Sequence, residues 1–179
     1  NNSGSSHRLG VEIESLYSIN NLFDLQTSLS FSSNKNKSYI SNFNGQLVDF
    51  GNTNISFSPD LVASNALVYS INDNSSLSLL SKYVGKQYMS NTDSEFSLLN
   101  SYFINDLNFS HAFDNTYVFD SITFSLLVNN VFNVEYVSNG YYYTYDDTWS
   151  DPNKVTTIEG TGYYPQATRN FLAGIQLRF

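Results

Sequence analysis

Residues 169–179 read Arg169-Asn170-Phe171-Leu172-Ala173-Gly174-Ile175-Gln176-Leu177-Arg178-Phe179. Every second position from Phe171 to Phe179 is apolar, and most positions between them are polar or small. Successive side chains of a β-strand point to opposite faces, so a period of two predicts a strand with one apolar face. This stretch is the clearest such signal in the chain.

Six other segments have the same period of two, so we predict seven strands in all. Their ranges are 9–19, 23–32, 55–70, 76–88, 98–113 and 121–129. Pro59 lies inside the third range, where it lacks a ladder donor and predicts a bulge or a locally unpaired position. The predicted connections alternate in length. Short turns are expected at 20–21, 72–74 and 114–116, and long polar loops at 34–54, 89–97 and 137–168.

Short turns at one end and long loops at the other are typical of an outer-membrane β-barrel. In lipid every backbone group must be paired, so spanning strands occur only in closed barrels. We therefore predict a transmembrane antiparallel β-barrel segment whose apolar face meets lipid and whose polar face meets a wet lumen. The residues expected to face lipid are Phe124, Leu126, Phe171, Ile175 and Leu177, and those expected to face the lumen are Ser121, Thr123, Ser125, Asn170 and Gln176.

A soluble β-sandwich also alternates and is the competing interpretation. Two features favour the barrel. Polar side chains persist in the middle of the strands, where a wet lumen would solvate them. Aromatic residues also gather at the turn-proximal strand ends, as an interfacial girdle requires. They are Tyr17, Phe23, Phe113, Tyr117, Phe119 and Phe179.

The composition narrows the functional classes. Asn and Ser supply 24 and 28 of the 179 residues, and charged residues only 13%. The formal net charge is −8, and the eight Lys and Arg residues do not cluster, so nucleic acid is not an expected partner. There is no Cys, which excludes thiol chemistry and disulfides. The longest apolar run, 171–175, is far shorter than the roughly 20 residues that a transmembrane helix needs.

Several motifs resemble known outer-membrane proteins. The last strand, with Phe171, Ile175, Leu177 and the terminal Phe179, resembles the signal that such proteins present to the barrel-assembly machinery. Five other motifs resemble the barrel of TonB-dependent receptors from Bacteroidetes-type bacteria. They are His7-Arg8-Leu9-Gly10-Val11-Glu12-Ile13-Glu14, Ser81-Lys82-Tyr83-Val84-Gly85-Lys86-Gln87-Tyr88, Tyr102-Phe103-Ile104-Asn105-Asp106-Leu107, Val128-Asn129-Asn130-Val131-Phe132-Asn133 and Tyr163-Tyr164-Pro165-Gln166-Ala167.

The resemblance implies a 22-stranded barrel with an amino-terminal plug and a TonB-contacting segment, in the outer membrane of a Gram-negative bacterium. Residues 1–179 carry neither plug nor TonB box, and seven strands cannot close a barrel. We therefore expect them to be the carboxyl-terminal third of such a barrel, as a fragment, a nicked product or a split subunit. The implied partners are the plug and earlier strands, the TonB complex acting through the plug, the barrel-assembly machinery, lipid and lipopolysaccharide, and a surface lipoprotein.

The function implied by the resemblance is import of a scarce nutrient: iron-siderophore, haem, vitamin, oligosaccharide or peptide. Two alternatives stay open, a structural or partner-binding barrel within a larger surface complex and a diffusion porin. We expect no enzymatic activity and no cofactor. His7 and His111 are predicted at opposite strand ends, which suggests no catalytic dyad, and no Gly-rich phosphate loop is present.

The candidate ligand-binding residues are Tyr142, Tyr145 and Trp149 in the longest predicted loop, where clustered aromatic side chains form either a ligand platform or internal packing. Tyr163 and Tyr164, beside a strand start, are expected in the outer aromatic belt. Three acidic residues of the same loop match no calcium-binding pattern, and we expect a solvated acidic loop without metal. They are Asp146, Asp147 and Asp151. We expect lumen solvation rather than plug or substrate contact for Glu12, Glu14, Lys82 and Lys86.

Overall fold

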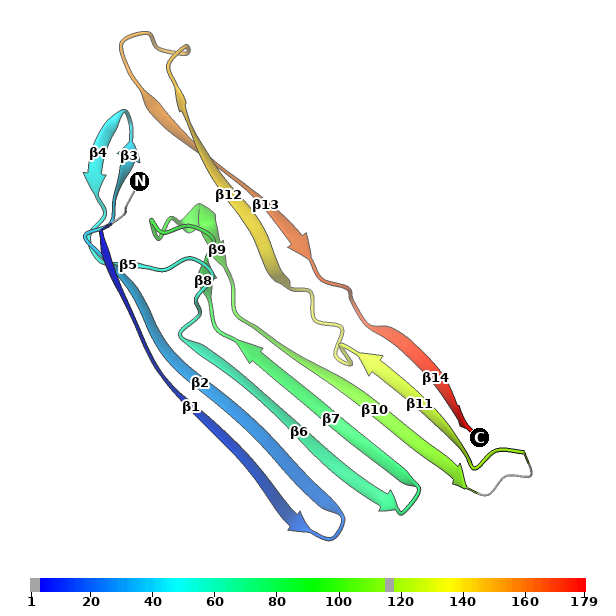
Figure 1. The fold of residues 1–179 in the computed structure, drawn as a ribbon. Coiled ribbons are helices and arrows are strands. Elements are labelled where there is room, and N and C mark those ends of the chain that lie inside the picture. Colours follow the sequence, from blue (N-terminus) through cyan, green and yellow to red (C-terminus); the bar gives the residue numbers. More distant parts are fainter. Residues whose placement is uncertain (1–3, 115–117) are drawn as a thin grey trace.

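The computed structural model describes residues 4–114 and 118–179, which form one large antiparallel sheet with smaller hairpins at one end (Figure 1). Seven long strands follow one another in the order β1-β2-β6-β7-β10-β11-β14, and the short β5 (Thr53–Asn54) pairs with β2. The predicted seven-strand meander is therefore confirmed. The seven strands are β1 (Ser5–Asn20), β2 (Phe23–Lys37), β6 (Leu61–Asn72), β7 (Ser75–Val84), β10 (Tyr102–Asp114), β11 (Ser121–Asn129) and β14 (Asn170–Arg178).

The register places apolar side chains on one face of the sheet. One row of directly paired residues crosses all seven strands and is apolar throughout: Tyr17, Leu25, Leu67, Leu79, Leu107, Val128 and Phe171. A row on the opposite face crosses five strands and consists of Ser70, Ser76, Ser110, Ser125 and Gly174. Directly paired residues share a face, so the sheet has one apolar side and one polar side.

The same register confirms how the sequence divides the residues of β11 and β14 between the two faces of the sheet. Phe124 pairs with Ile175 and Ile122 with Leu177 on one face, while Thr123 pairs with Gln176 on the other. The apolar side is not covered, since Ile175 is 71% exposed. Among the described residues only Val84, Met89 and Leu99 are buried apolar side chains. A soluble β-sandwich would bury its apolar face between two sheets, so that alternative is wrong.

Several strand boundaries differ from the prediction. β1 begins at Ser5 rather than at residue 9, and β2 ends at Lys37 rather than at residue 32. β6 begins at Leu61 rather than at residue 55, because Pro59 has no N–H to donate and lies before the strand, where its carbonyl accepts a bond from Ser32 Oγ at 2.9 Å. β7 ends at Val84 and β10 begins at Tyr102. The predicted extensions instead form a separate pair, β8 (Gln87–Tyr88) and β9 (Leu98–Leu99).

The short turns fall where the sequence places them. Asn20 Oδ1 accepts bonds from Leu22 N at 2.8 Å and Phe23 N at 3.0 Å, which closes the turn between β1 and β2. Asn72 Oδ1 accepts a bond from Asn74 N at 3.0 Å in the turn between β6 and β7. Part of the third predicted turn and the girdle residue Tyr117 lie outside the described residues.

The predicted loops are not irregular throughout, and that part of the prediction is wrong. Range 34–54 contains the end of β2, the hairpin β3 (Ile40–Phe43) and β4 (Gln46–Asp49), and β5. Range 137–168 contains the long hairpin β12 (Val137–Asp147) and β13 (Thr156–Pro165). Range 89–97 ends in a 3₁₀ helix, η1 (Glu95–Ser97), capped by Ser94. Among the described residues no helix is long and apolar enough to cross a membrane.

Candidate functional site

The three long connections meet at the end of the sheet opposite the short turns (Figure 1). The β3–β4 hairpin docks on the β12–β13 hairpin through Asn44 and Thr157. Asn44 N donates to Thr157 Oγ1 at 2.7 Å, and Thr157 N donates back to Asn44 Oδ1 at 2.8 Å. Asp146 reinforces this contact, because its carboxylate accepts bonds from Thr157 Oγ1 and Asn42 Nδ2.

A glycine makes this docking possible. Asn44 and Gly45 have φ of 53° and 72°, the left-handed conformation of a tight hairpin turn. A Cβ on Gly45 would lie 3.0–3.2 Å from the Val155 side chain. Close approach of the two hairpins therefore requires glycine at this position.

The connection at 89–97 is tied to the connection between β2 and β6 by two acceptor side chains, Asp93 and Asn91. Asp93 accepts bonds from Asn54 N and Asn54 Nδ2, both at 2.9 Å. Asn91 Oδ1 accepts a bond from Ser56 N at 2.8 Å. Together with the Asn44–Thr157 contact, these bonds join the three connections into one hydrogen-bonded assembly, which we call the rim.

The rim encloses a cavity of about 460 Å³, within the usual range for small-ligand sites. We call it the rim cavity. Glu159 of β13 lies in its wall, and its Oε1 accepts bonds from Ser94 Oγ and Tyr142 Oη, both at 2.5 Å. The lining residues are Tyr39, Ser41, Asn42, Phe43, Phe50, Met89, Ser90, Asn91, Thr92, Ser94, Tyr142, Thr144 and Glu159.

Tyr142 is a neutral hydrogen-bond donor in this wall. Burial, together with the hydrogen bond to Glu159 and the negative charge of that residue, raises the pKa of Tyr142 to about 12. The phenol therefore keeps its proton throughout the physiological range and holds Glu159 in place.

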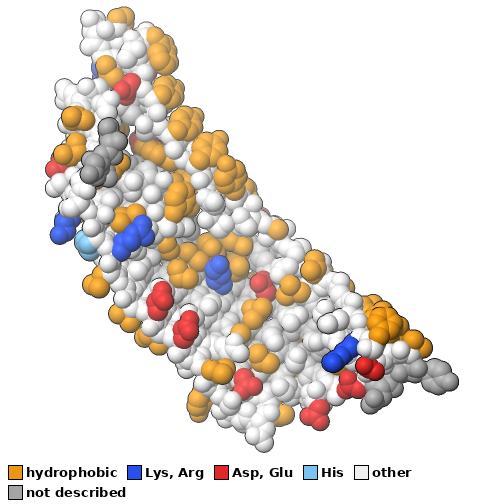
Figure 2. Space-filling model, viewed as in Figure 1, with side chains coloured by type: hydrophobic (Ala, Val, Ile, Leu, Met, Phe, Trp, Pro, Cys, Tyr) orange, Lys and Arg blue, Asp and Glu red, His pale blue; other side chains and the backbone are white. Residues whose placement is uncertain are grey.

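The opposite face of the β12–β13 hairpin carries a continuous row of aromatic rings, which we call the aromatic ladder. Successive ring centroids are 6.1, 6.3, 6.5 and 6.0 Å apart, and the last two rings are parallel within 2°. Figure 2 shows hydrophobic side chains in a row along this hairpin. The ladder consists, in spatial order, of Tyr164, Tyr141, Tyr143, Tyr145 and Trp149.

Two glycines of β13 lie beneath the ladder. Gly162 pairs with Tyr141 and Gly160 with Tyr143. A Cβ at either glycine would lie within about 2.4 Å of a ring atom of the paired tyrosine. The rings therefore lie flat across the hairpin, covering backbone that glycine leaves bare, an arrangement that stabilises glycine-containing sheets.

The structure divides the three predicted ligand residues between two faces. Tyr145 and Trp149 belong to the exposed ladder, with exposed fractions of 45% and 67%. Tyr142 points to the other side and lines the rim cavity. The sequence already contained the signal for this division. Tyr141, Tyr143 and Tyr145 alternate with Tyr142 and Thr144, as on the two faces of a strand.

The three acidic residues of this segment act separately. Asp146 is part of the rim contact, not a solvated loop residue. Hydrogen bonds from Ser150, and one from Trp149 N, hold the pKa of exposed Asp147 below its usual value. Asp151 accepts a bond from Asn153 N at 3.0 Å. Within 4–114 and 118–179, no three His, Asp or Glu side chains are grouped to hold a metal ion.

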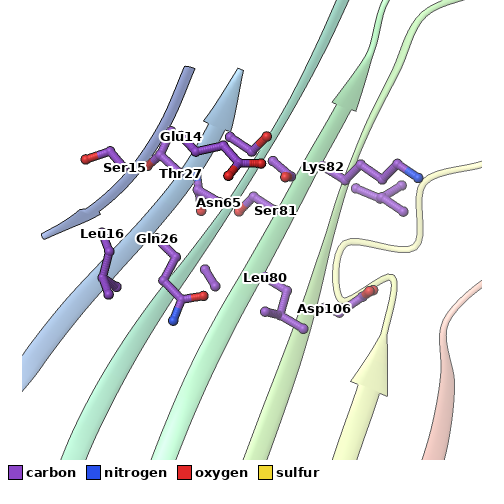
Figure 3. A pocket seen from close by; sticks show the side chains of 14 residues that line it. Glu14, Ser15, Leu16, Gln26, Thr27, Asn65, Leu80, Ser81, Lys82 and Asp106 are labelled. Carbon is purple, nitrogen blue, oxygen red and sulfur yellow. The ribbon is translucent and has the colours of Figure 1, made fainter. Parts of the chain in front are cut away.

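The polar face of the sheet has a second cavity, a trough of about 710 Å³ (Figure 3). The trough forms because Ser28, Ser64 and Ala66 are small, while longer side chains surround them. Glu14 and Lys82 both line the trough, but Figure 3 shows the Lys82 side chain extending away from Glu14. Of the four charged residues predicted on this face, Glu12 shares the face of Glu14 but lines a different hollow, and Lys86 lies beyond the end of β7.

The predicted assembly residues lie along the exposed edge strand. Phe171, Ile175 and Leu177 share the apolar face of β14. Phe179 follows the strand, and its ring centroid is 4.9 Å from that of Phe119. Within the described residues β14 pairs only with β11, and β1 only with β2, so the sheet has two free edges.

Comparison with known proteins gives structural matches only. No protein-family model matches the sequence, and no curated protein matches it. The siderophore receptor PiuA of Acinetobacter baumannii superposes with a TM-score of 0.65 at 16% identity, over 95% of this chain and 22% of the receptor. The closed form of the ferric-catecholate import receptor Fiu of E. coli K12 gives 0.65 at 15% identity, over 97% and 21%. The ferric yersiniabactin uptake receptor FyuA of Yersinia pestis gives 0.65 at 16% identity, over 97% and 23%.

These matches establish the fold. The structural neighbours are TonB-dependent receptor barrels, so the predicted antiparallel segment of a transmembrane β-barrel is confirmed. The chain spans about a fifth of the length of each matched receptor.

Proposed function

We propose that residues 1–179 form part of the barrel wall and the outer mouth of a TonB-dependent import receptor in the outer membrane of a Gram-negative bacterium. The observation that carries the proposal is the apolar row, from Tyr17 to Phe171, which crosses seven strands without a covering layer. An uncovered apolar face of this extent is stable against lipid and aggregates in water.

The proposal includes the missing partners. Earlier strands of the same barrel pair with the free edges of β1 and β14, and a plug occupies the lumen and connects the receptor to the TonB complex. The β14 stripe ending in Phe179 is the signal for the barrel-assembly machinery. Lipid and lipopolysaccharide cover the apolar face, and a surface lipoprotein is a further partner. Placement as the carboxyl-terminal third of a 22-stranded barrel, from a Bacteroidetes-type bacterium, rests on the sequence motifs.

We assign the imported nutrient to the outer mouth. Tyr145 and Trp149 of the ladder and Tyr142 of the rim cavity are the proposed ligand contacts. Flat, exposed rings at regular spacing bury much ligand surface at small side-chain entropy cost. The nutrient classes that fit such a platform are iron-siderophore, haem, vitamin, oligosaccharide and peptide.

The test is uptake by cells that produce or lack the full-length protein. Labelled ferric siderophores, haem, cobalamin, oligosaccharides and peptides are supplied separately at limiting concentration, in strains with and without TonB. We expect uptake of one class to fall in both deletions, and to fall when Tyr145 and Trp149 are replaced by Ala at unchanged surface abundance. Uptake that continues without TonB would identify a porin. Uptake unaffected by loss of the protein would identify a structural barrel.

A further inference from the structure

The wall of the rim cavity carries a carboxylate. Among the described residues that line the cavity, none is Lys, Arg or His, and Glu159 is the sole acidic residue. Lys35 and Lys86 line a different cavity, together with Asp60. Two further carboxylates, Asp93 and Asp146, belong to the rim itself. Lys35 donates to Asn54, which in turn donates to Asp93, so a cation lies near that carboxylate. The charged side chain in the cavity wall itself, Glu159, is anionic.

Glu159 is oriented with one oxygen held and one oxygen available. Ser94 Oγ and Tyr142 Oη both donate to Oε1. Within 4–114 and 118–179, no hydrogen bond reaches Oε2. Glu159 is half-buried, so its position is fixed by the wall while Oε2 can accept from a molecule in the cavity.

The remaining walls provide flat apolar surface and neutral hydrogen-bonding groups. The rings of Phe43 and Phe50 meet edge to face, with centroids 6.0 Å apart. Tyr39 lies with them in the lining, and Asn42, Thr92 and Thr144 supply neutral polar groups. Such walls accommodate rings or alkyl segments that also carry hydroxyl or amino groups.

We infer that the rim cavity is a binding site for a neutral or positively charged ligand, whose hydroxyl or ammonium group donates to Glu159 Oε2, and that it discriminates against anions. This inference rests on the proposed function, since it names the class of nutrient that the mouth admits. Ferric catecholate complexes are anionic, because catecholate oxygens supply more negative charge than iron(III) neutralises. The ligand class therefore differs from the one that Fiu is named for.

The charge preference can be measured without knowing the ligand. Thr144 lies directly opposite Glu159 in the β12–β13 pairing, so a thiol there is about 6 Å from the carboxylate. The chain contains no Cys, so Thr144→Cys introduces a single reporter into residues 1–179. The full-length receptor, with any other cysteines replaced by Ser, is reacted with methanethiosulfonates that carry a trimethylammonium, a sulfonate or a neutral methyl group. Rates are normalised to those of free cysteine.

One charge at about 6 Å in a water-like dielectric changes the cation-to-anion rate ratio about tenfold at low salt. We expect a normalised ratio near ten for Thr144→Cys, falling several-fold when Glu159→Gln is added. Asp151→Asn is the matched control, because it removes the same charge from the exposed hairpin outside the cavity. That variant should change the ratio less than twofold, since distance and ions screen it.

Other outcomes overturn the inference. A ratio near one, a preference for the sulfonate reagent, or a ratio unchanged by Glu159→Gln would each do so. Ser41→Cys is a second reporter in the same lining. If both thiols are unreactive in folded receptor, another part of the protein fills the cavity and it is not a ligand site. The labelling ratio does not depend on transport. A preserved rate ratio without TonB-dependent uptake would therefore contradict the proposed import function but not this inference. TonB-dependent uptake without a charge preference in labelling would contradict this inference but not the import function.

Discussion

A lysine in place of Ile175 should destabilise the folded barrel, whereas a lysine in place of Gln176 should not. Ile175 is 71% exposed on the apolar face, paired with Phe124. It precedes Phe179 by four residues, which is about 13 Å along a strand and about 10 Å along the membrane normal at the usual tilt. Phe179 is assigned to the aromatic girdle, and the apolar band is about 25 Å tall, so Ile175 lies close to the bilayer midplane.

A lysine at this depth costs about 2–4 kcal/mol, which is about thirty- to several-hundred-fold in the folding equilibrium constant. The assay is denaturant unfolding of the full-length receptor in lipid vesicles, followed by the heat-modifiable shift in gel mobility. Gln176→Lys is the matched control, one residue away on the polar face. Equal midpoints for the two variants would refute the assignment of the apolar face to lipid.

Three further predictions follow from single contacts. Deletion of Phe179, which removes its ring contact with Phe119 and the end of the apolar stripe, should lower surface abundance much more than ligand affinity; equal abundance on quantitative immunoblots would remove the assembly role. Asn44→Ala removes the acceptor for buried Thr157 N and should cost about 1–3 kcal/mol of rim stability. In limited proteolysis, we expect faster cleavage of the two hairpins and unchanged resistance of the barrel. The pKa of Tyr142 is raised from 10.0 to about 12. The contribution of its hydrogen bond with Glu159 to the stability of the folded protein should therefore be complete below pH 10 and lost as pH rises through about 12. In ultraviolet titration, Tyr142→Phe should remove a tyrosinate transition near pH 12, and an unchanged titration would contradict the assignment.

The strands could be predicted from the sequence because one local rule determines them. A shift of one residue in register would move every apolar side chain to the other face, so the alternation fixes the facing as well as the strand. This explains why the assignment of Phe124 and Ile175 to one face and Thr123 and Gln176 to the other is confirmed. Pro59 marks the limit of the rule: the alternation predicts it inside a strand, whereas it precedes β6, which begins at Leu61.

The outer hairpins were missed, although the sequence holds signals for both. Asn-Gly is the strongest short hairpin signal, and Asn44-Gly45 lies in range 34–54, for which we predict a loop. Tyr141 to Tyr145 alternate in the same way as the recognised strands. The rim cavity itself could not be predicted. Ser94 and Glu159 are 65 residues apart, and their contact depends on how two separate connections dock. No local period encodes such a contact.

The two faces of the β12–β13 hairpin have different physical tasks, and this decides how its variants should be interpreted. An isolated two-stranded hairpin is only marginally stable in water. One face gains stability from the rim, through Thr157 and Asp146, and the other from rings that cover Gly160 and Gly162. The ladder is therefore the hairpin's own apolar layer as well as the proposed platform. Removing Tyr141 or Tyr143 exposes the glycine backbone beneath, so lost uptake there confounds binding with folding. Trp149 stacks at the end of the row without a paired glycine, so its substitution separates ligand binding from hairpin stability.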